Sequence, residues 1–264
     1  MTVIDKKMIA LSFGKAAGTY DSVAHFQRWA GLSLLDKIPL TDARVVLDMG
    51  CGTGYFGPSL AERFPGAAYI GLDLSEQMLR YARSQHPEQN AWLAGDAENL
   101  PLKEHTVDLV YSSLAIQWCA DLPGLMAEVN RVLKPGGLFV FSSLLDGTLC
   151  ELKRAWAEVD TRQHVNNFFL KERYHSAAAE AGFQLRLLEQ EKHVLRYQKV
   201  TELMRELKAL GAHNLNADRA SALTGRSRLL SLINAYECFR DHDGLLPASY
   251  QLIWGVLEKR PYKN

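Results

Sequence analysis

The sequence lacks several features that would point directly to a class of protein. Its four cysteines in 264 residues are scattered without a CxxC pair, which argues against a disulfide framework and a zinc site. The 30 basic and 30 acidic residues cancel, so net charge gives no reason to expect a nucleic-acid or membrane partner. No apolar run approaches the ~20 residues of a membrane span, and the N-terminal stretch lacks the apolar segment of a signal peptide. We therefore expect a soluble, cytoplasmic protein that holds no metal ion.

What the sequence does contain is an alternation of strand-like apolar runs with helix-like stripes, which is typical of a parallel α/β sheet. The region before residue 40 is predicted to be helical, and a second helical region, about 193–244, separates the last two strands. Strands are predicted at 45–49, 68–72, 107–112, 138–144, 183–189 and 250–257, with a short one before Asp96, and helices at 75–84, 122–133 and 172–181.

Three glycines follow the first predicted strand in the stretch LDMGCGTG, residues 47–54. A strand, a glycine-rich turn and a helix form the place where an open parallel sheet binds a nucleotide-like ligand, because backbone without Cβ lets the ligand approach. Gly50, Gly52 and Gly54 give GxGxG, whereas nicotinamide-binding turns have GxGxxG, and Tyr55 stands where their third glycine is needed. The spacing therefore disfavours a nicotinamide dinucleotide.

Two side chains of this turn bear on the ligand. Asp48 precedes the first glycine by two residues, and its carboxylate would repel a pyrophosphate but attract a cationic amino acid. This favours S-adenosylmethionine, whose methionine part carries an ammonium and a sulfonium. Cys51 is expected to fill space in the turn, with a catalytic thiol as the alternative.

Two further carboxylates follow at suitable places. Asp73, in GLDLS, ends the second predicted strand and could accept hydrogen bonds from both ribose hydroxyls. Asp96, in AGDAENLP, follows the short third strand and could accept from the adenine amino group. Each carboxylate alone could equally be a helix or turn cap. The cofactor-binding candidates also include Leu74, Ala97 and Ser113.

Taken together, VLDMGCGTG, GLDLS, GDAENLP and LKPGG resemble the motifs of class I S-adenosylmethionine-dependent methyltransferases. The resemblance implies a Rossmann-like α/β sheet of seven, mostly parallel strands, with N-terminal helices and a helical insertion before the last strand. We expect a single domain over residues 1–264, with 1–40 as a helical cover and 193–244 as an insertion or lid.

The stretch SSLAIQWC, residues 112–119, follows the fourth strand, where the transferable methyl group would lie. The Asn/Asp-Pro-Pro-Tyr motif of amide and amine methylases is absent from it. Gln117 offers an amide instead, and Trp118 offers an aromatic face that would attract a sulfonium by about 0.5–2 kcal/mol. The alternative for Trp118 is a core position.

Over almost its whole length the chain is similar to the malonyl-acyl-carrier-protein O-methyltransferases of biotin synthesis. The similarity includes FGKAAGTYD at 13–21, ELKRAWAEVDTRQHVNNF at 151–168, LKALGAHNL at 207–215 and YQLIWGVLEK at 250–259. It implies methylation of the free carboxylate of malonyl-acyl-carrier protein, or of malonyl-coenzyme A, to a methyl ester that primes a pimeloyl chain. The alternatives are another small carboxylic acid, a quinone ring, or a non-catalytic cofactor-binding regulator.

A malonyl carboxylate is already ionised at neutral pH, so its methylation needs no general base, but it needs a cationic or hydrogen-bonding partner when it is buried. Arg162 is the first candidate for this partner and Arg154 the second, although either could be a solvated surface charge. His164 is expected to cap or pack.

Three residues near the N-terminus complete the candidate site. Tyr20 could cover the methyl group while its hydroxyl holds cofactor or substrate, and its alternative is a residue that anchors a helix. Gln27 and Arg28 could meet the cofactor's methionine carboxylate.

In the insertion, Arg205 and Lys208 are candidates for docking an acidic carrier protein, unless Glu202 and Glu206 neutralise them.

Overall fold

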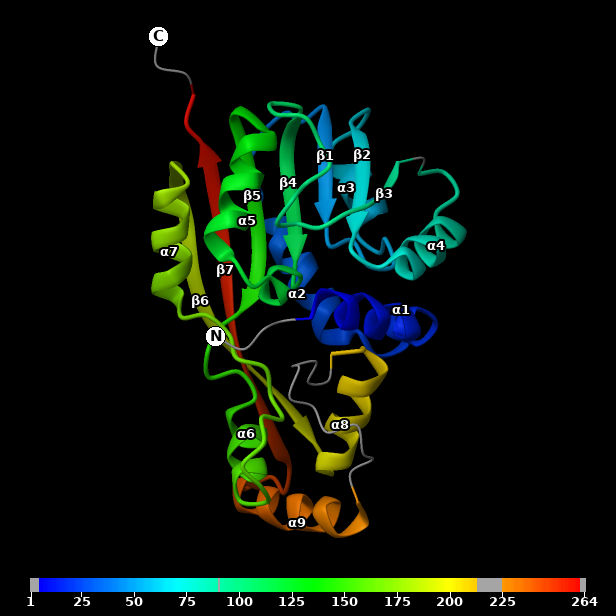
Figure 1. Cartoon of the computed structure of the whole chain (residues 1–264), viewed down its shortest axis with the longest axis vertical. Coiled ribbons are helices and arrows are strands. Elements are labelled where there is room, and N and C mark those ends of the chain that lie inside the picture. The colour runs from blue at the N-terminus through cyan, green and yellow to red at the C-terminus, as the bar shows by residue number, and fades with distance from the viewer. Residues whose placement is uncertain (1–4, 90, 213–224, 262–264) are drawn as a thin grey trace.

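The computed structural model of the chain describes residues 5–89, 91–212 and 225–261. Its strands are β1 (Val45–Met49), β2 (Ala68–Asp73), β3 (Trp92–Ala94), β4 (Val107–Ser113), β5 (Leu133–Leu144), β6 (Phe183–Tyr197) and β7 (Leu246–Lys259). Within the described ranges they form one seven-stranded sheet in the order β3-β2-β1-β4-β5-β7-β6 (Figure 1). β1 to β5 pair in parallel, and β7 is antiparallel to both of its neighbours. The predicted mostly parallel sheet of seven strands is confirmed.

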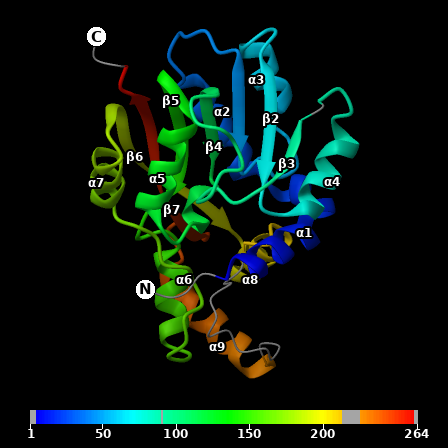
Figure 2. The same cartoon turned by 45° about the horizontal axis from the view of Figure 1, so that its top comes forward.

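The helices cover both faces of the sheet (Figures 1 and 2). They are α1 (Lys6–Val23), α2 (His25–Asp36), α3 (Gly57–Arg63), α4 (Glu76–Gln85), α5 (Leu122–Val132), α6 (Cys150–Ala157), α7 (Lys171–Glu180), α8 (Val200–Ala209) and α9 (Arg226–Tyr236), with short 3-10 turns η1 (Ile116–Trp118) and η2 (Glu237–Phe239). None of the helices in the described ranges is long and apolar enough to cross a membrane.

Alternation of side chains along the central strands builds two apolar clusters. In β1, Val46 belongs to the cluster that contains residues of α2 and α3, and Leu47 belongs to the cluster that contains residues of α5 and α7. Successive side chains of a strand point to opposite faces, so a strand buried on both sides reads as a continuous apolar run. The first cluster also contains buried residues of α6, α8 and α9.

The C-terminal strands are longer than predicted. β6 continues to Tyr197 and pairs with β7 along its whole length, from Phe183 opposite Lys259 to Tyr197 opposite Leu246. The predicted start of the helical insertion at 193 is therefore wrong, because residues 193–197 belong to β6 and the first helix after it begins at Val200. Part of the predicted insertion, residues 213–224, lies outside the described residues.

Two local features position the site. Helix α4 starts as predicted, with the Ser75 hydroxyl accepting a hydrogen bond from the Met78 amide. Helix α1 begins after Asp5, whose side chain accepts from the amides of Lys7 and Met8. It lies across the ends of the parallel strands, between α4 and α8 (Figures 1 and 2). The N-terminal helix thus covers the edge of the sheet at which a ligand of this fold is expected.

Candidate active site

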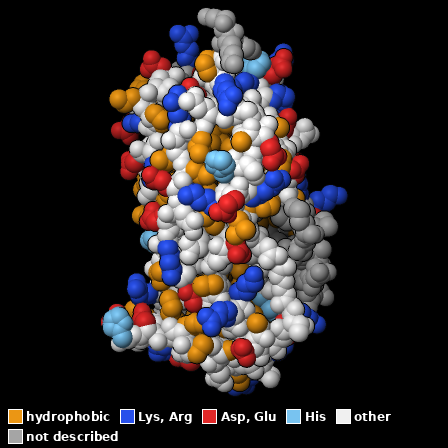
Figure 3. Space-filling model, turned by 90° about the vertical axis from the view of Figure 1, so that its left-hand side faces the viewer, with side chains coloured by type: hydrophobic (Ala, Val, Ile, Leu, Met, Phe, Trp, Pro, Cys, Tyr) orange, Lys and Arg blue, Asp and Glu red, His pale blue; other side chains and the backbone are white. Residues whose placement is uncertain are grey.

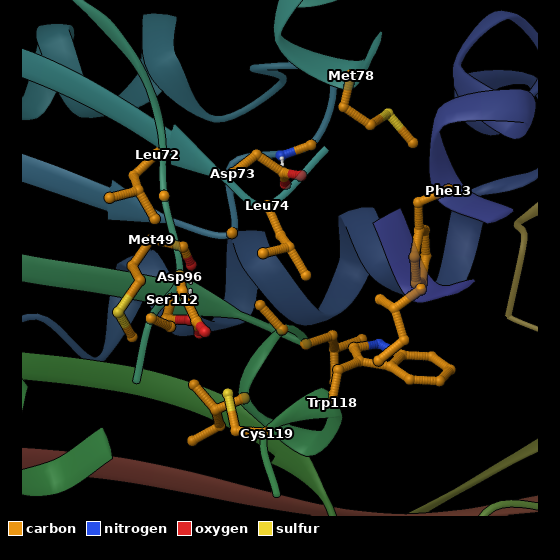
Figure 4. Close-up of a pocket in the computed structure, with 18 of the residues that line it drawn as sticks. Phe13, Met49, Leu72, Asp73, Leu74, Met78, Asp96, Ser112, Trp118 and Cys119 are labelled. Carbon is orange, nitrogen blue, oxygen red and sulfur yellow. Dashed lines mark hydrogen bonds between the residues drawn. The ribbon is translucent and has the colours of Figure 1, made fainter. Parts of the chain in front are cut away.

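A cavity with about 810 Å³ of empty space lies between α1 and the last residues of β1, β2 and β4 (Figure 4). This volume includes space that is open to solvent. Nine predicted residues line it: Tyr20, Gly50, Gly52, Asp73, Leu74, Asp96, Ala97, Ser113 and Trp118. Seven predicted residues do not: Gln27, Arg28, Asp48, Cys51, Gly54, Gln117 and Arg162.

The glycine turn needs small residues for three different reasons. All three glycines have positive φ, at 77° for Gly50, 53° for Gly52 and 78° for Gly54. A Cβ on Gly50 would lie 2.3 Å from the Cβ of Ala115, and one on Gly54 would lie 2.6 Å from the ring of Trp92. A Cβ on Gly52 would meet nothing within 4 Å, so this glycine leaves open space beside the cavity that it lines.

Asp73 ties the glycine turn to the start of α4. One carboxylate oxygen accepts from the Gly52 amide at 2.9 Å, and the other accepts from the Ser75 amide at 2.8 Å. Burial raises the pKa of Asp73, and these two backbone donors oppose the rise. Each carboxylate oxygen can accept more than one hydrogen bond, so the group can also receive ribose hydroxyls. Its place at the end of β2 fits the predicted nucleoside contact.

Asp96 has a basic partner that the sequence analysis missed. The Lys6 ammonium donates to Asp96 at 2.5 Å and also pairs with Glu98. Burial lowers the pKa of Lys6, but the hydrogen bonds to Asp96 and Glu98 outweigh it, and the net pKa is raised. Nothing near Lys6 in the sequence indicates this pairing, which joins residues 90 positions apart. The pair fastens the start of α1 to the loop after β3.

Three aromatic rings form a row along the cavity. Phe13 meets Trp118 edge to face, with ring centroids 5.2 Å apart and an interplanar angle of 80°, and lies 6.4 Å from Tyr20. Figure 4 shows Phe13 reaching from α1 toward Trp118. Phe13 was not among the predicted site residues, although its spacing of seven from Tyr20 places both on one helix face. Such a row is suited to a sulfonium, because aromatic faces attract cations.

The Tyr20 hydroxyl is protonated and available. Burial first, and then the charges of Asp73 and Asp21, raise the pKa of Tyr20 far above its ordinary value. Within the described part of the chain the hydroxyl has no hydrogen-bond partner. It can therefore donate to a ligand but cannot act as a base near neutral pH.

Asp48 and Cys51 are buried beside the turn rather than in the cavity wall. The Asp48 carboxylate accepts from the Tyr69 hydroxyl at 2.9 Å, and burial raises the pKa of Asp48 to about 7 despite this bond. Burial also raises the pKa of Cys51 well above its usual range. A protonated, buried thiol is no nucleophile, which agrees with a space-filling Cys51.

Gln117 uses both ends of its amide inside the protein. Its nitrogen donates to the Leu114 carbonyl at 2.6 Å, and its oxygen accepts from the Ser143 hydroxyl at 3.4 Å. Leu114 has a φ of 48°, which turns the chain sharply after β4. The Gln117 side chain therefore stabilises the turn after β4 through these two hydrogen bonds. The prediction placed this amide at the reacting groups instead. Ser113, which lines the cavity, lies 3.2 Å from the Ser142 hydroxyl.

Gln27 and Arg28 lie in α2, outside the lining of the cavity. The Gln27 amide oxygen and the Arg28 Nε are buried without a hydrogen-bond partner, and the Arg28 guanidinium stacks 5.0 Å above the ring of Tyr55. Tyr55 directly follows the glycine turn. The Arg28 Nε is a donor and can bind a carboxylate, whereas the free Gln27 oxygen is an acceptor and cannot. The contact of these two residues with the cofactor's methionine carboxylate remains a prediction.

The two arginines predicted for the malonyl carboxylate are exposed and lie outside the cavity lining. Arg162 follows α6, and its amide donates to Asp160. Arg154, on α6, stacks 5.2 Å from the ring of Phe239. His164 packs as expected, with its ring 3.7 Å from that of Trp156. Of the described residues that line the cavity, Lys6 is the only basic one.

The sequence is similar to those of known methyltransferases. A family model described as a methyltransferase domain matches residues 47–141. The malonyl-[acyl-carrier protein] O-methyltransferase of Pectobacterium atrosepticum is 43% identical over 255 residues, which are 96% of each chain. The chain belongs to the malonyl-[acyl-carrier protein] O-methyltransferase family. Membership confirms the predicted methyltransferase class and S-adenosylmethionine as its cofactor.

Other relatives differ in length. The biotin biosynthesis bifunctional protein BioHC of Cellvibrio japonicus is 50% identical over 98% of this chain but only 51% of its own length. That of Saccharophagus degradans is 41% identical over 46% of its length, so the chain spans about half of these two curated relatives. Among solved structures, YcgJ of Bacillus subtilis has a TM-score of 0.61 at 20% identity, covering 88% of this chain and 98% of that one. This likeness supports the fold alone.

Proposed function

We propose that the chain transfers the methyl group of S-adenosylmethionine to the free carboxylate of malonyl-acyl-carrier protein, giving the methyl ester that primes a pimeloyl chain in biotin synthesis. The observation that carries the proposal is the 43% identity over 96% of both chains to an enzyme named for this reaction. The cavity agrees with it, since it places a carboxylate, a glycine turn and three aromatic rings around one space.

The proposed reaction requires no base. A lone pair of the malonyl carboxylate forms the new O–CH₃ bond, the S–CH₃ bond breaks, and its electron pair stays on sulfur without any proton transfer. The cavity offers no strong base at the aromatic row: burial raises the pKa of Cys119 and of Tyr20, so both keep their protons. Positioning and exclusion of water are left as the main sources of acceleration.

Tyr20 is the described side chain best suited to orient the acceptor. Its neutral hydroxyl can donate a hydrogen bond to a carboxylate, and its ring belongs to the aromatic row with Phe13. Lys6 is less suited, because Asp96 and Glu98 already hold its charge. Arg162 and Arg154 do not line the cavity, so they could bind the malonyl carboxylate only while it is still outside the cavity.

Replacing Tyr20 by phenylalanine tests this role. We expect Tyr20→Phe to lower turnover about tenfold or more while cofactor affinity changes little, because the ring remains and only the hydroxyl is lost. Steady-state kinetics and calorimetry measure the two effects separately. Equal turnover in both proteins would reduce Tyr20 to a packing residue.

The direct test of the function is mass spectrometry of malonyl-acyl-carrier protein after incubation with the enzyme and S-adenosylmethionine. We expect the mass of one methyl group on the carrier protein, and none when acetyl replaces malonyl. Methylation of a quinone or of an unrelated carboxylic acid, with malonyl left unchanged, would support the rival enzymes. Cofactor binding without transfer to any acceptor would support a regulator.

The substrate form and location belong to the same proposal. We favour the carrier protein over malonyl-coenzyme A because the relatives at full length carry the carrier protein in their names. A cytoplasmic location is supported by the four free cysteines, which suit a reducing compartment.

A further inference from the structure

Helix α1 has two faces with different properties. One face carries Ile9, Phe13 and Tyr20 to the cavity. The opposite face exposes two apolar side chains, Met8 at 41% and Leu11 at 49%. The same exposed side carries the basic residues Lys7 and Lys15. The helix that closes the cavity therefore presents an apolar pair between two cations.

Helix α8 adds two more exposed cations, Arg205 and Lys208. In the described part of the chain, neither acid of this helix, Glu202 or Glu206, forms an ion pair with them. The Glu202 carboxylate accepts from the amides of Gln198 and Lys199 at the start of the helix. Glu206 accepts from the Tyr197 hydroxyl, and its burial raises the pKa of this carboxyl. The basic side chains are thus left to face solvent.

The two helices are fastened to each other. The hydroxyls of Ser12 and Thr19 donate to the carbonyls of Gly211 and Ala209, at 3.0 and 3.1 Å. Gly211 has a φ of 72°, and a Cβ there would lie 2.8 Å from the Ser12 carbonyl oxygen. Figures 1 and 2 show α8 beside α1 in both views. A partner that touches both helices would therefore meet one joined surface.

We propose that this surface docks the carrier protein, and the proposal rests on the proposed function. We use the name α1–α8 surface for the exposed side chains Lys7, Met8, Leu11 and Lys15 of α1 together with Arg205 and Lys208 of α8. None of its four cations has an ion-pair partner among the residues that the structure describes. The acid beside it, Asp5, is engaged with the first amides of α1.

Charge complementarity identifies the partner. Acyl-carrier proteins are acidic, so four unpaired cations around an apolar pair match them in sign and attract them over a distance. On the face shown in Figure 3, by contrast, basic and acidic side chains are interspersed. Helix α1 separates this surface from the cavity, and a helix with its side chains is about 10 Å thick. A malonyl group carried by a partner docked on the surface therefore has only about this distance to cover.

The test compares two double charge reversals. The test variant is Lys15→Glu with Lys208→Glu, one residue on each helix. The matched control is Arg44→Glu with Lys103→Glu, both exposed and both in loops that lead into parallel strands, at the opposite edge of the sheet. Each variant is assayed with malonyl-acyl-carrier protein and with an uncharged small malonyl thioester at several salt concentrations.

We expect the KM for the carrier protein to rise about tenfold at low salt in the test variant only. Its salt dependence should become shallower, and the small thioester should react normally. Equal behaviour of the two variants, or an equal loss with both substrates, would overturn the docking proposal. So would a change in self-association by sedimentation, which would assign the surface to a second copy of the chain. Failure of the wild type with both substrates would instead overturn the proposed function.

Discussion

Asp73 is the single residue that joins most parts of the site. Its two oxygens hold the glycine turn and the start of α4, and the residue lines the cavity in which we expect a nucleoside to lie. We expect Asp73→Ala to weaken S-adenosylmethionine binding by about 1.5–3 kcal/mol, measured by calorimetry, because hydrogen bonds to a charged group are lost.

A suitable control is Asp121→Ala. Asp121 caps helix α5, with its carboxylate accepting from the Gly124 amide, but it does not line the cavity. Asp121→Ala should lower the free energy of unfolding by about 1 kcal/mol, the usual cost of losing a helix cap, and leave cofactor affinity unchanged. Unchanged affinity in a folded Asp73→Ala protein would contradict the ribose assignment.

Asp48 should make stability depend on pH. Its ordinary pKa is 3.8, and burial raises the pKa in the folded protein to about 7. Between these values the folded chain keeps a proton that the unfolded chain releases, so the free energy of unfolding falls as pH rises. The loss is complete above about pH 7.

Replacing Asp48 by asparagine removes this titration while leaving an oxygen to accept from Tyr69. From pH 5 to pH 8, urea unfolding of the wild type should lose about 2 kcal/mol more than that of Asp48→Asn. Parallel pH profiles would show that Asp48 is ionised in the fold throughout this range.

The sequence predicts those site residues whose roles depend on local context. The glycine turn and Asp73 follow directly from a strand, a spacing and a second strand end. Lys6 and Phe13 were missed because their contacts depend on how α1 lies against loops far away in the chain. The amide of Gln117 was misplaced because Leu114 adopts a left-handed backbone conformation that redirects the turn. Leucine rarely adopts this conformation, so the sequence does not indicate it.

At the scale of elements, the packing of α8 on α1 should matter for turnover. Gly211 and Gly182 each lie two residues after a helix end and have positive φ, 72° and 82°. A Cβ on Gly182 would meet nothing within 4 Å, whereas one on Gly211 would press against the backbone of α1. Alanine at either position causes backbone strain, but only alanine at Gly211 would also disturb the contact between α8 and α1. Comparing the two variants therefore separates these effects.

We expect Gly182→Ala to cost about 1–2 kcal/mol of stability and leave kinetics unchanged. Gly211→Ala should cost more and also lower turnover several-fold, since α1 carries Phe13 and Tyr20. Denaturant unfolding and steady-state assays measure both quantities. If Gly211→Ala matched Gly182→Ala in both, α8 would not control the position of α1.

The strands differ in how well the sequence predicts them. β1 and β4 are buried on both sides, so their apolar runs give bounds that are correct to within a residue. β6 is an edge strand whose residues 189–192 are all exposed and polar. Backbone hydrogen bonds to β7 extend it, and such bonds leave no apolar pattern for a prediction to follow. The helical insertion was consequently given too early a start.

At the scale of the whole molecule, the cavity lies between the sheet and helix α1. The sheet supplies Asp73 and the glycine turn, and α1 supplies Phe13 and Tyr20. Outside the cavity, α1 packs against α4 and α8. It is also held by Lys6 at its start and by the hydroxyl of Thr53, which donates to Asp21 near its end. A ligand that bridges sheet and helix should therefore suppress opening of α1.

Hydrogen exchange with S-adenosylhomocysteine, the demethylated product, tests this coupling. At a ligand concentration of 100 times Kd, linkage stabilises the liganded state by about 2.7 kcal/mol, so α1 amides that exchange by local opening should slow by up to about 100-fold. Amides of α9, which does not line the cavity, should slow only where they exchange by global unfolding. Asp73→Ala at the same ligand concentration should lose the protection of α1. Protection spread equally over α1 and α9 in the wild type would mean that α1 opens only when the whole molecule unfolds.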